Sequence, residues 1–182
     1  MLARLRARLA NKLIPDELRQ GRILDVGCGS KAYFLAHTSF QEKFAVDQLS
    51  PSATIGSIAW HTLDLNCEPR LPFADGFFDA ISMLAVIEHL DPGNLVALFR
   101  ETHRTLREGG MLLITTPAAW SDGLLHGMAR VNLVSAEEIN EHKYAYTLPL
   151  LGWYFGMASF DMNQVKFGYF ECGLNMWATA TR

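Results

Sequence analysis

An apolar run that ends in a glycine pair is the segment of this 182-residue chain with the clearest chemical meaning. Residues 23–26 read Ile-Leu-Asp-Val and lead directly into Gly27-Cys28-Gly29. Glycines at a strand-to-helix turn let a ligand approach the backbone, and the following helix offers free N–H groups. The pattern predicts a binding turn, with an ordinary structural turn as the alternative.

Two carboxylates are predicted at the ends of the next two strands. Asp47, followed by Gln48, lies about 20 residues beyond the glycines, where a carboxylate accepts hydrogen bonds from ribose hydroxyls. Asp64 and Leu65 end a weaker third strand, and Asp64 either receives an adenine amino group or caps a turn. These positions together predict a cofactor that contains a nucleoside.

A dinucleotide cofactor is an alternative, because Gly27-x-Gly29-x-x-Ala32 also satisfies the dinucleotide fingerprint. An NAD(P)-dependent oxidoreductase would place its pyrophosphate at this turn, beside the negative charge of Asp25. A carboxylate is more useful there if the ligand carries an ammonium group, as an amino-acid moiety does. Asp25 therefore favours a nucleoside joined to an amino acid.

The elements that position these residues alternate between short apolar runs and helical patterns, which is typical of a parallel α/β sheet. Thr147 is expected to cap a last helix that ends near Ser159. Two final strands, joined through Cys172-Gly173, predict an antiparallel C-terminal hairpin. The fold expected is α/β, a doubly wound, seven-stranded, mostly parallel sheet with helices on both faces. Strands are predicted over 22–26, 44–47, a run ending at 63–64, 80–86, 111–116, 164–171 and 175–181, and helices over 33–41 and 95–106, the latter stopped by Gly109-Gly110.

The composition of the chain limits the classes of function that it can have. Hydrophobic residues make up 49% of the chain, enough for the core of one domain over residues 1–182. The net charge of −3 gives no global positive field, so nucleic acid is not an expected partner. Cys28, Cys67 and Cys172 form no CxxC pair, which argues for a reducing, cytoplasmic location and against a zinc site. No dense Asp/Glu/His cluster predicts any other metal site.

The motifs, taken in order, resemble those of the class I, seven-stranded, Rossmann-like methyltransferases that use S-adenosylmethionine. The resemblance covers roughly residues 20–117 and rests on 25–29, Asp47, 64–65, 71–80, 87–90 and 106–110. It implies S-adenosyl-L-methionine as cofactor and S-adenosyl-L-homocysteine as product. It also implies roles for individual residues: Asp25, Gly27, Cys28 and Gly29 at the methionine portion, Asp47 with Gln48 at the ribose, Asp64 and Leu65 at the adenine, and Ala85 or Val86 near the sulfonium. Lys31 stands where many members have a third glycine.

Histidines are the candidates for chemistry on a methyl acceptor. His89 follows the fourth predicted strand, and imidazole takes a proton near neutral pH. His142 is the second candidate, and for both the alternative is a structural hydrogen bond. Residues 118–147 are predicted to form an insertion over the acceptor site. Its aromatic and histidine residues, with one from the next helix, predict a pocket for a small molecule whose hydroxyl is methylated, of quinone-, sugar- or lipid-like type: Trp120, His126, His142, Tyr144, Tyr146 and Trp153. A non-catalytic partner subunit that binds the cofactor is the alternative.

The N-terminus differs in charge from the rest of the chain. Residues 1–22 hold six basic and two acidic residues, and Leu2, Leu5, Leu9 and Leu13 fall on one helical face. Residues 1–20 thus predict a basic amphipathic helix with three alternative roles: packing on its own domain, a lid over the cofactor, or a peripheral contact of residues 1–14 with an anionic membrane. The sequence indicates no oligomeric state.

Overall fold

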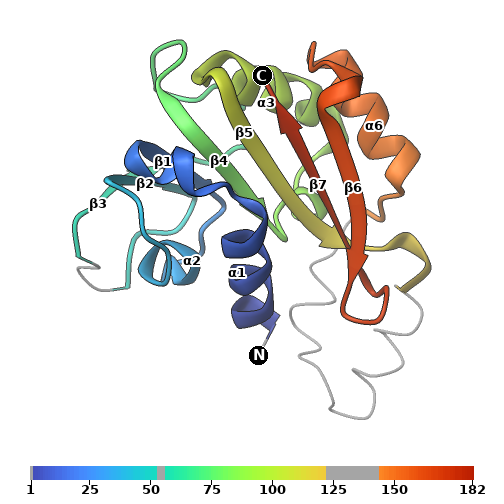
Figure 1. Cartoon of the computed structure of the whole chain (residues 1–182), viewed down its shortest axis with the longest axis horizontal. Helices are drawn as coiled ribbons and strands as arrows, with labels where there is room; N and C mark the ends of the chain where they lie inside the picture. Colours follow the sequence, from blue (N-terminus) through green and yellow to red (C-terminus); the bar gives the residue numbers. More distant parts are fainter. Residues whose placement is uncertain (1, 53–55, 122–143) are drawn as a thin grey trace.

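The computed structural model describes residues 2–52, 56–121 and 144–182. Its seven strands form one sheet in the order β3-β2-β1-β4-β5-β7-β6 (Figure 1). Strands β1 to β5 pair in parallel, and β7 pairs antiparallel with both β5 and β6. The predicted fold class is therefore confirmed. The strands are β1(Arg22–Val26), β2(Glu42–Asp47), β3(Ile58–Thr62), β4(Phe78–Leu84), β5(Leu106–Pro117), β6(Val165–Phe170) and β7(Asn175–Thr181).

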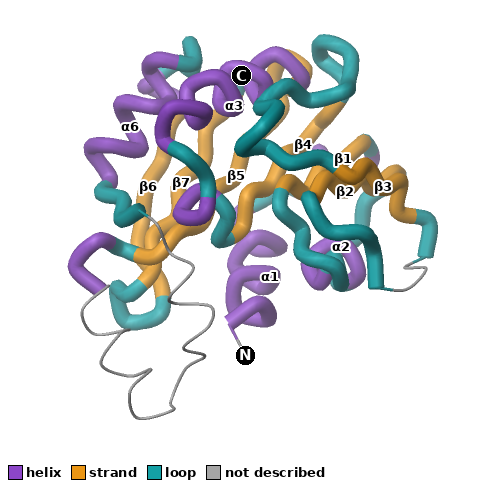
Figure 2. The backbone as a smooth tube through the Cα atoms, turned by 180° about the vertical axis from the view of Figure 1, so that it is seen from behind, coloured by secondary structure: helices purple, strands orange, loops and turns teal. Residues whose placement is uncertain are grey.

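Two layers of helices cover the sheet, as Figures 1 and 2 show from opposite sides. Helices α1(Leu2–Leu13) and α2(Tyr33–Ala36) lie side by side on one face, where Ala10 and Phe34 join a buried cluster with Leu113 of β5. Helices α3(Pro92–Thr105) and α6(Leu148–Met157) cover the other face, where Leu98 and Phe155 are buried. Four short 3-10 helices complete the described elements: η1(Asp16–Gln20), η2(Ile87–His89), η3(Ala119–Ser121) and η4(Met162–Gln164).

The strand order sets the place of a binding site. The chain runs outward from β1 through β2 to β3, then returns to β4 on the other side of β1. The crossovers beyond the carboxyl ends of β1 and β4 thus lead to opposite sides, and ligands of open α/β sheets bind in the crevice at such a reversal. The glycine turn follows β1 at this point.

The helix predicted over 33–41 is wrong in length, because α2 contains only Tyr33–Ala36. The ammonium group of Lys43, on β2, donates hydrogen bonds to the backbone oxygens of Leu35 and Thr38, at 2.8 and 2.6 Å. A longer helix would need the Leu35 oxygen for its own N–H groups. A contact from a later strand therefore ends α2 early.

Gly109 and Gly110 do not stop the preceding helix, contrary to the prediction. Helix α3 ends at Thr105, and both glycines lie inside β5. Gly109 has φ +73°, and a Cβ on Gly110 would lie 2.9 Å from the backbone oxygen of Arg107. The pairing of β5 with β4 shifts register beside them, so the glycines permit an irregularity in the strand.

Strand β4 begins and ends two residues earlier than predicted, at Phe78 and Leu84. Ala85 has φ +58°, a left-handed conformation that ends the extended run. Its N–H still donates a 2.9 Å hydrogen bond to Thr115 of β5. Strand β3 likewise ends before the predicted 63–64 boundary, at Thr62. Residues 63–64 and 85–86, predicted as strand ends, therefore lie in loops that follow the carboxyl ends of β3 and β4.

The C-terminal part agrees with its prediction. The Thr147 hydroxyl accepts a hydrogen bond from the N–H of Leu150 and caps α6. Residues 171–173 all have positive φ and join β6 to β7 in a tight antiparallel hairpin. In the part of the chain that the structure describes, every helix is too short or too polar to cross a bilayer.

Candidate functional site

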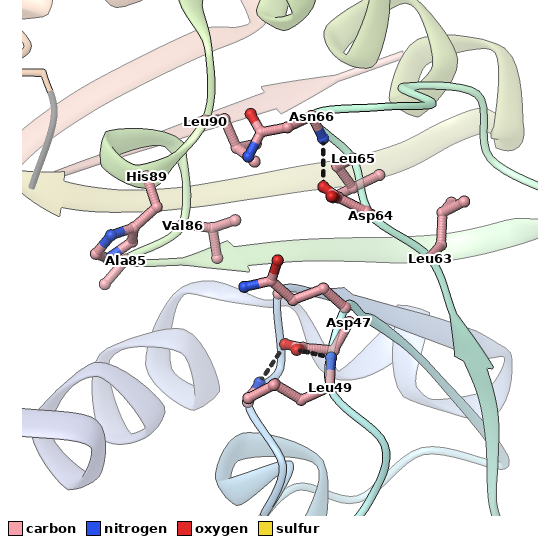
Figure 3. Close-up of a pocket in the computed structure, with 13 residues that line it drawn as sticks. Asp47, Leu49, Leu63, Asp64, Leu65, Asn66, Ala85, Val86, His89 and Leu90 are labelled. Atoms are coloured by element: carbon pink, nitrogen blue, oxygen red, sulfur yellow. Dashed lines mark hydrogen bonds between the residues drawn. The ribbon is translucent and has the colours of Figure 1, made fainter. Parts of the chain in front are cut away.

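A cavity of about 460 Å³ lies at the carboxyl ends of β1, β2 and β4 (Figure 3). Its volume is in the range of small-molecule and cofactor pockets. Asp47 and Leu49 form one wall, and residues 64–66 face them across the space. Eight residues predicted from the sequence as site residues line it, together with Val86, the alternative to Ala85: Gly27, Gly29, Asp47, Gln48, Asp64, Leu65, Ala85 and His89.

The glycine turn is fixed by its neighbours. Gly27 has φ +69°, and a Cβ there would lie 2.5 Å from a methyl group of Val86. Gly29 has φ +64°, and a Cβ there would meet nothing within 4 Å, since this glycine borders the open cavity. The first glycine is therefore required by packing, and the second leaves the backbone accessible to a ligand.

Asp47 connects the turn to the end of β2. Its Oδ2 accepts a hydrogen bond from the N–H of Gly29 at 2.7 Å, and its Oδ1 accepts one from the N–H of Leu49 at 2.9 Å. Each carboxylate oxygen accepts more than one hydrogen bond, so both retain capacity toward the cavity. The side chain is buried, which strengthens such bonds.

Asp64 has the turn-capping geometry that was the alternative to adenine contact. Its Oδ1 accepts a hydrogen bond from the N–H of Asn66 at 2.9 Å, and its Oδ2 accepts one from the Cys67 thiol at 3.3 Å. The side chain also lines the cavity. Leu63 and Leu65 border the cavity on either side of it, so this wall combines apolar surface with one carboxylate.

The segment after β4 forms one end of the cavity. Ala85 and His89 lie together there, and Val86 lies between them and the Asp64 wall (Figure 3). His89 belongs to η2, whose first residues are buried, so its backbone position is fixed by the core. His89 is partly exposed and lines the cavity.

Asp25 and Cys28 lie outside this cavity and line a second one of about 70 Å³. Gly27 lines both cavities, which makes them neighbours. The Ser82 hydroxyl donates a 2.6 Å hydrogen bond to Oδ1 of Asp25. Burial raises the pKa of Asp25 to about 7, Ser82 opposes the rise, and the charge of Asp47 adds to it.

Cys28 has the properties of a small packing residue. Burial and the charges of Asp25 and Asp47 raise the pKa of its thiol far above the usual range, so it remains protonated. Across the described residues, no three His, Cys, Asp or Glu side chains are grouped so as to hold a metal ion.

Two predicted acceptor-site residues lie outside the described residues: His126 and the second catalytic candidate, His142. Tyr146 is buried and donates a 3.1 Å hydrogen bond to the backbone oxygen of Ile87, so it supports η2. Trp120, Tyr144 and Trp153 are exposed.

The sequence interpretation missed two kinds of residue. Leu49, Leu63 and Leu90 line the large cavity, but isolated leucines in loops carry no distinguishing pattern. Arg6 of α1 lines the small cavity beside Asp25, although 19 positions separate them in the chain. Its signal was the excess of arginine in residues 1–22, which did not indicate which arginine faces inward.

A family model described as a methyltransferase domain matches residues 1–165. The chain belongs to this methyltransferase family. The match includes α1, the glycine turn and every strand that contributes to the two cavities. S-adenosylmethionine is the cofactor that the family implies for this methyltransferase, and the match favours methyl transfer over the dinucleotide alternative.

Solved structures share the fold of this methyltransferase at low sequence identity. A SAM-dependent methyltransferase from Archaeoglobus fulgidus has a TM-score of 0.72 at 17% identity, covering 100% of this chain and 95% of that one. One from Mesorhizobium loti has a TM-score of 0.68 at 14% identity, covering 97% and 98%. A complex of the Haloferax volcanii Trm112 methyltransferase activator with a methyltransferase matches with a TM-score of 0.72 at 16% identity, covering 96% and 88%. Among curated protein sequences, none matches.

Proposed function

We propose that this methyltransferase transfers a methyl group from S-adenosylmethionine to a hydroxyl of a small molecule of quinone-, sugar- or lipid-like type. The observation that carries the proposal is the carboxylate of Asp47, held between the N–H groups of Gly29 and Leu49 at the cavity wall. A nucleoside ribose offers two adjacent hydroxyls to such an acceptor. When bound, the cofactor supplies a methyl group activated on a positively charged sulfur.

The residues of the large cavity fit the nucleoside portion. Leu63, Leu65 and Leu90 give apolar surface for a flat base, and Asp64 offers an acceptor for its amino group. Gly29 leaves space at the backbone for close approach. In the smaller cavity, Asp25 offers a carboxylate to an ammonium group. The polar and apolar groups of the two cavities thus suit an adenosine joined to an amino acid.

We assign His89 the role of general base toward the acceptor hydroxyl. It lies with Ala85 at one end of the large cavity, apart from the ribose wall at Asp47 (Figure 3). Deprotonating a hydroxyl near neutral pH requires a group of imidazole-like acidity. The remaining contribution of the chain is to orient the acceptor and exclude water.

Thermal unfolding with S-adenosylhomocysteine and with NAD(H) tests the cofactor. A ligand at a hundred times its dissociation constant stabilises a protein by about 2.7 kcal/mol, which raises the melting temperature by roughly 5–11 °C at this size. We expect this shift with S-adenosylhomocysteine, its loss in Asp47→Ala, and its retention in Asp161→Ala. Asp161 is the matched control because its carboxylate also accepts a hydrogen bond from a backbone N–H, that of Asn163, but caps η4 and does not line the large cavity. A shift with NAD(H) alone would overturn the proposal.

Turnover over a panel of quinols, sugars and lipids separates an enzyme from a cofactor-binding partner subunit. Release of S-adenosylhomocysteine with one class identifies the acceptor. Cofactor binding without turnover on the whole panel would support the partner-subunit alternative.

The membrane contact predicted for residues 1–14 is a separate proposal. Arg4, Arg8 and Lys12 are exposed, which supports a basic outer face of α1. Flotation with anionic and neutral vesicles tests it. Equal recovery with both kinds of vesicle would end the idea.

A further inference from the structure

The small cavity presents two opposite charges to one space. It is lined by residues from α1, the end of β1, the glycine turn, the start of α2 and the end of β4. Its charged residues are Arg6 and Asp25. It adjoins the large cavity at Gly27, so a ligand that fills the large cavity can extend a short polar group into the small one.

Arg6 has an unsatisfied hydrogen-bonding group at this cavity. Its Nε is buried and has no hydrogen-bond partner. Among the ion pairs of the described residues, none includes Arg6. A buried charged donor without an acceptor is unfavourable, so this Nε–H group is well suited to an incoming anion.

Packing holds α1 in the position that brings Arg6 to the cavity. Ala7 and Ala10 are buried against the sheet face, and their small side chains permit close approach. Beyond them, the Asn11 amide donates a 3.0 Å hydrogen bond to the backbone oxygen of His37, and Arg19 donates one of 2.8 Å to the backbone oxygen of Asn11. Arg6 therefore approaches the cavity from a fixed helix.

We propose that Arg6 binds the carboxylate of the methionine portion of S-adenosylmethionine, while Asp25 binds its ammonium group. This assignment rests on the proposed function. An α-amino acid carries both charges on one carbon, and the small cavity offers one partner for each. The planar guanidinium forms two parallel hydrogen bonds with a carboxylate, which gives geometric selectivity as well as affinity. Helix α1 thereby becomes part of the cofactor site.

Two other carboxyl groups lie within the electrostatic reach of Arg6. Burial raises the pKa of Glu88 and of Glu171, and the charge of Arg6 opposes this rise in both. Because the net direction for both is upward, each is drawn toward its neutral form. They therefore compete less strongly for the guanidinium than a ligand carboxylate that remains ionised.

Calorimetric titration with two ligands on the full chain tests the proposal. S-adenosylhomocysteine carries the carboxylate and the ammonium, and its decarboxylated analogue keeps the amine alone. We expect the wild type to prefer S-adenosylhomocysteine by about 10- to 100-fold, because a hydrogen bond to a charged group contributes at this level. In Arg6→Met this preference should fall to about one, since only the carboxylate-bearing ligand loses a contact.

Arg8→Met is the matched control, because Arg8 lies on the same helix with an exposed side chain. It should keep the wild-type preference. Arg6→Lys keeps the charge without the planar fork and should give an intermediate value; if Arg6→Met does not fold, this variant decides the question. An Arg6 variant that retains the full preference, or a wild type that binds both ligands equally, would overturn the assignment. A wild type that binds neither ligand would instead refute the proposed cofactor.

Discussion

The backbone N–H of Gly29 donates a 2.7 Å hydrogen bond to Oδ2 of Asp47, which joins the turn after β1 to the end of β2. The left-handed backbone of Gly29 is thus held from a neighbouring strand. The second carboxylate oxygen bonds to the N–H of Leu49, so both oxygens are oriented by the backbone. The wall that faces the proposed ribose is therefore preorganised, which lowers the entropic cost of binding.

Asp47→Asn tests this dual role. Gly29 and Leu49 donate to different oxygens of Asp47, and an amide side chain replaces one of these acceptors with a donor NH2 group. We expect the affinity for S-adenosylhomocysteine to fall by about 10- to 100-fold and the free energy of unfolding to fall by about 1–3 kcal/mol. Calorimetric titration and urea unfolding measure the two effects. Wild-type affinity in this variant would remove Asp47 from the ribose site.

Cofactor affinity should depend on pH through Asp25. Its pKa of about 7 means that the carboxyl is mostly neutral in acid, whereas an ammonium ligand favours the carboxylate. We expect the dissociation constant of S-adenosylhomocysteine to increase about tenfold for each pH unit below about 7 and to level off above it. Asp25→Asn should bind more weakly above pH 7 and lose this slope. An unchanged slope in the variant would assign it to another group.

The same group makes the free energy of unfolding depend on pH. The Asp25 pKa is about 7 in the folded protein, against an ordinary value of 3.8, so the unfolded chain loses this proton first as the pH rises. The stability contributed by the protonated form is complete below about pH 4 and is lost by about pH 7. Without ligand, Asp25→Asn should therefore gain stability over the wild type as the pH rises through this window. Urea unfolding at both ends of the window checks the sign, and an opposite trend contradicts it.

His89→Ala should separate turnover from cofactor binding. With an acceptor identified by the panel, we expect turnover to fall by about 10²- to 10⁴-fold, because a general base contributes at that level. The dissociation constant of S-adenosylhomocysteine should stay within about twofold, an effect below 0.5 kcal/mol. His37→Ala is the control, since that exposed ring stacks on Tyr33 of α2 and does not line the large cavity. Unchanged turnover in His89→Ala would exclude the histidine from the mechanism.

The sequence pattern predicted those elements that are determined by residues close to one another in the chain. Strand β1 and the Thr147 cap depend on neighbours in sequence, and both appear as expected. The length of α2 could not be predicted, because Lys43 reaches it from another strand. The inward orientation of Arg6 also depends on tertiary packing, which brings α1 to the end of β4. Of the large cavity, the sequence indicated the glycines, Asp47 and Asp64, and it missed Leu49, Leu63 and Leu90, which have no chemical signature.

The two glycines of the turn should respond differently to alanine. Both have positive φ, so each substitution costs about 1 kcal/mol of backbone strain. A Cβ at Gly27 would also lie 2.5 Å from Val86, whereas one at Gly29 would enter the open cavity. We expect Gly27→Ala to lower the free energy of unfolding by about 1–3 kcal/mol more than the backbone strain alone, because the added Cβ overpacks this site. Gly29→Ala should instead mainly weaken the binding of S-adenosylhomocysteine.

Val86→Ala in the Gly27→Ala background provides the decisive comparison. Shortening Val86 removes the methyl groups that the new Cβ would meet, so the double variant should recover part of the lost stability. In the Gly29→Ala background, Val86→Ala removes no clash, so it should lower the free energy of unfolding by the same amount as it does in the wild type. Urea unfolding of the four variants measures this coupling. Equal effects of Val86→Ala in both backgrounds would show that the turn is strained only by its backbone conformation.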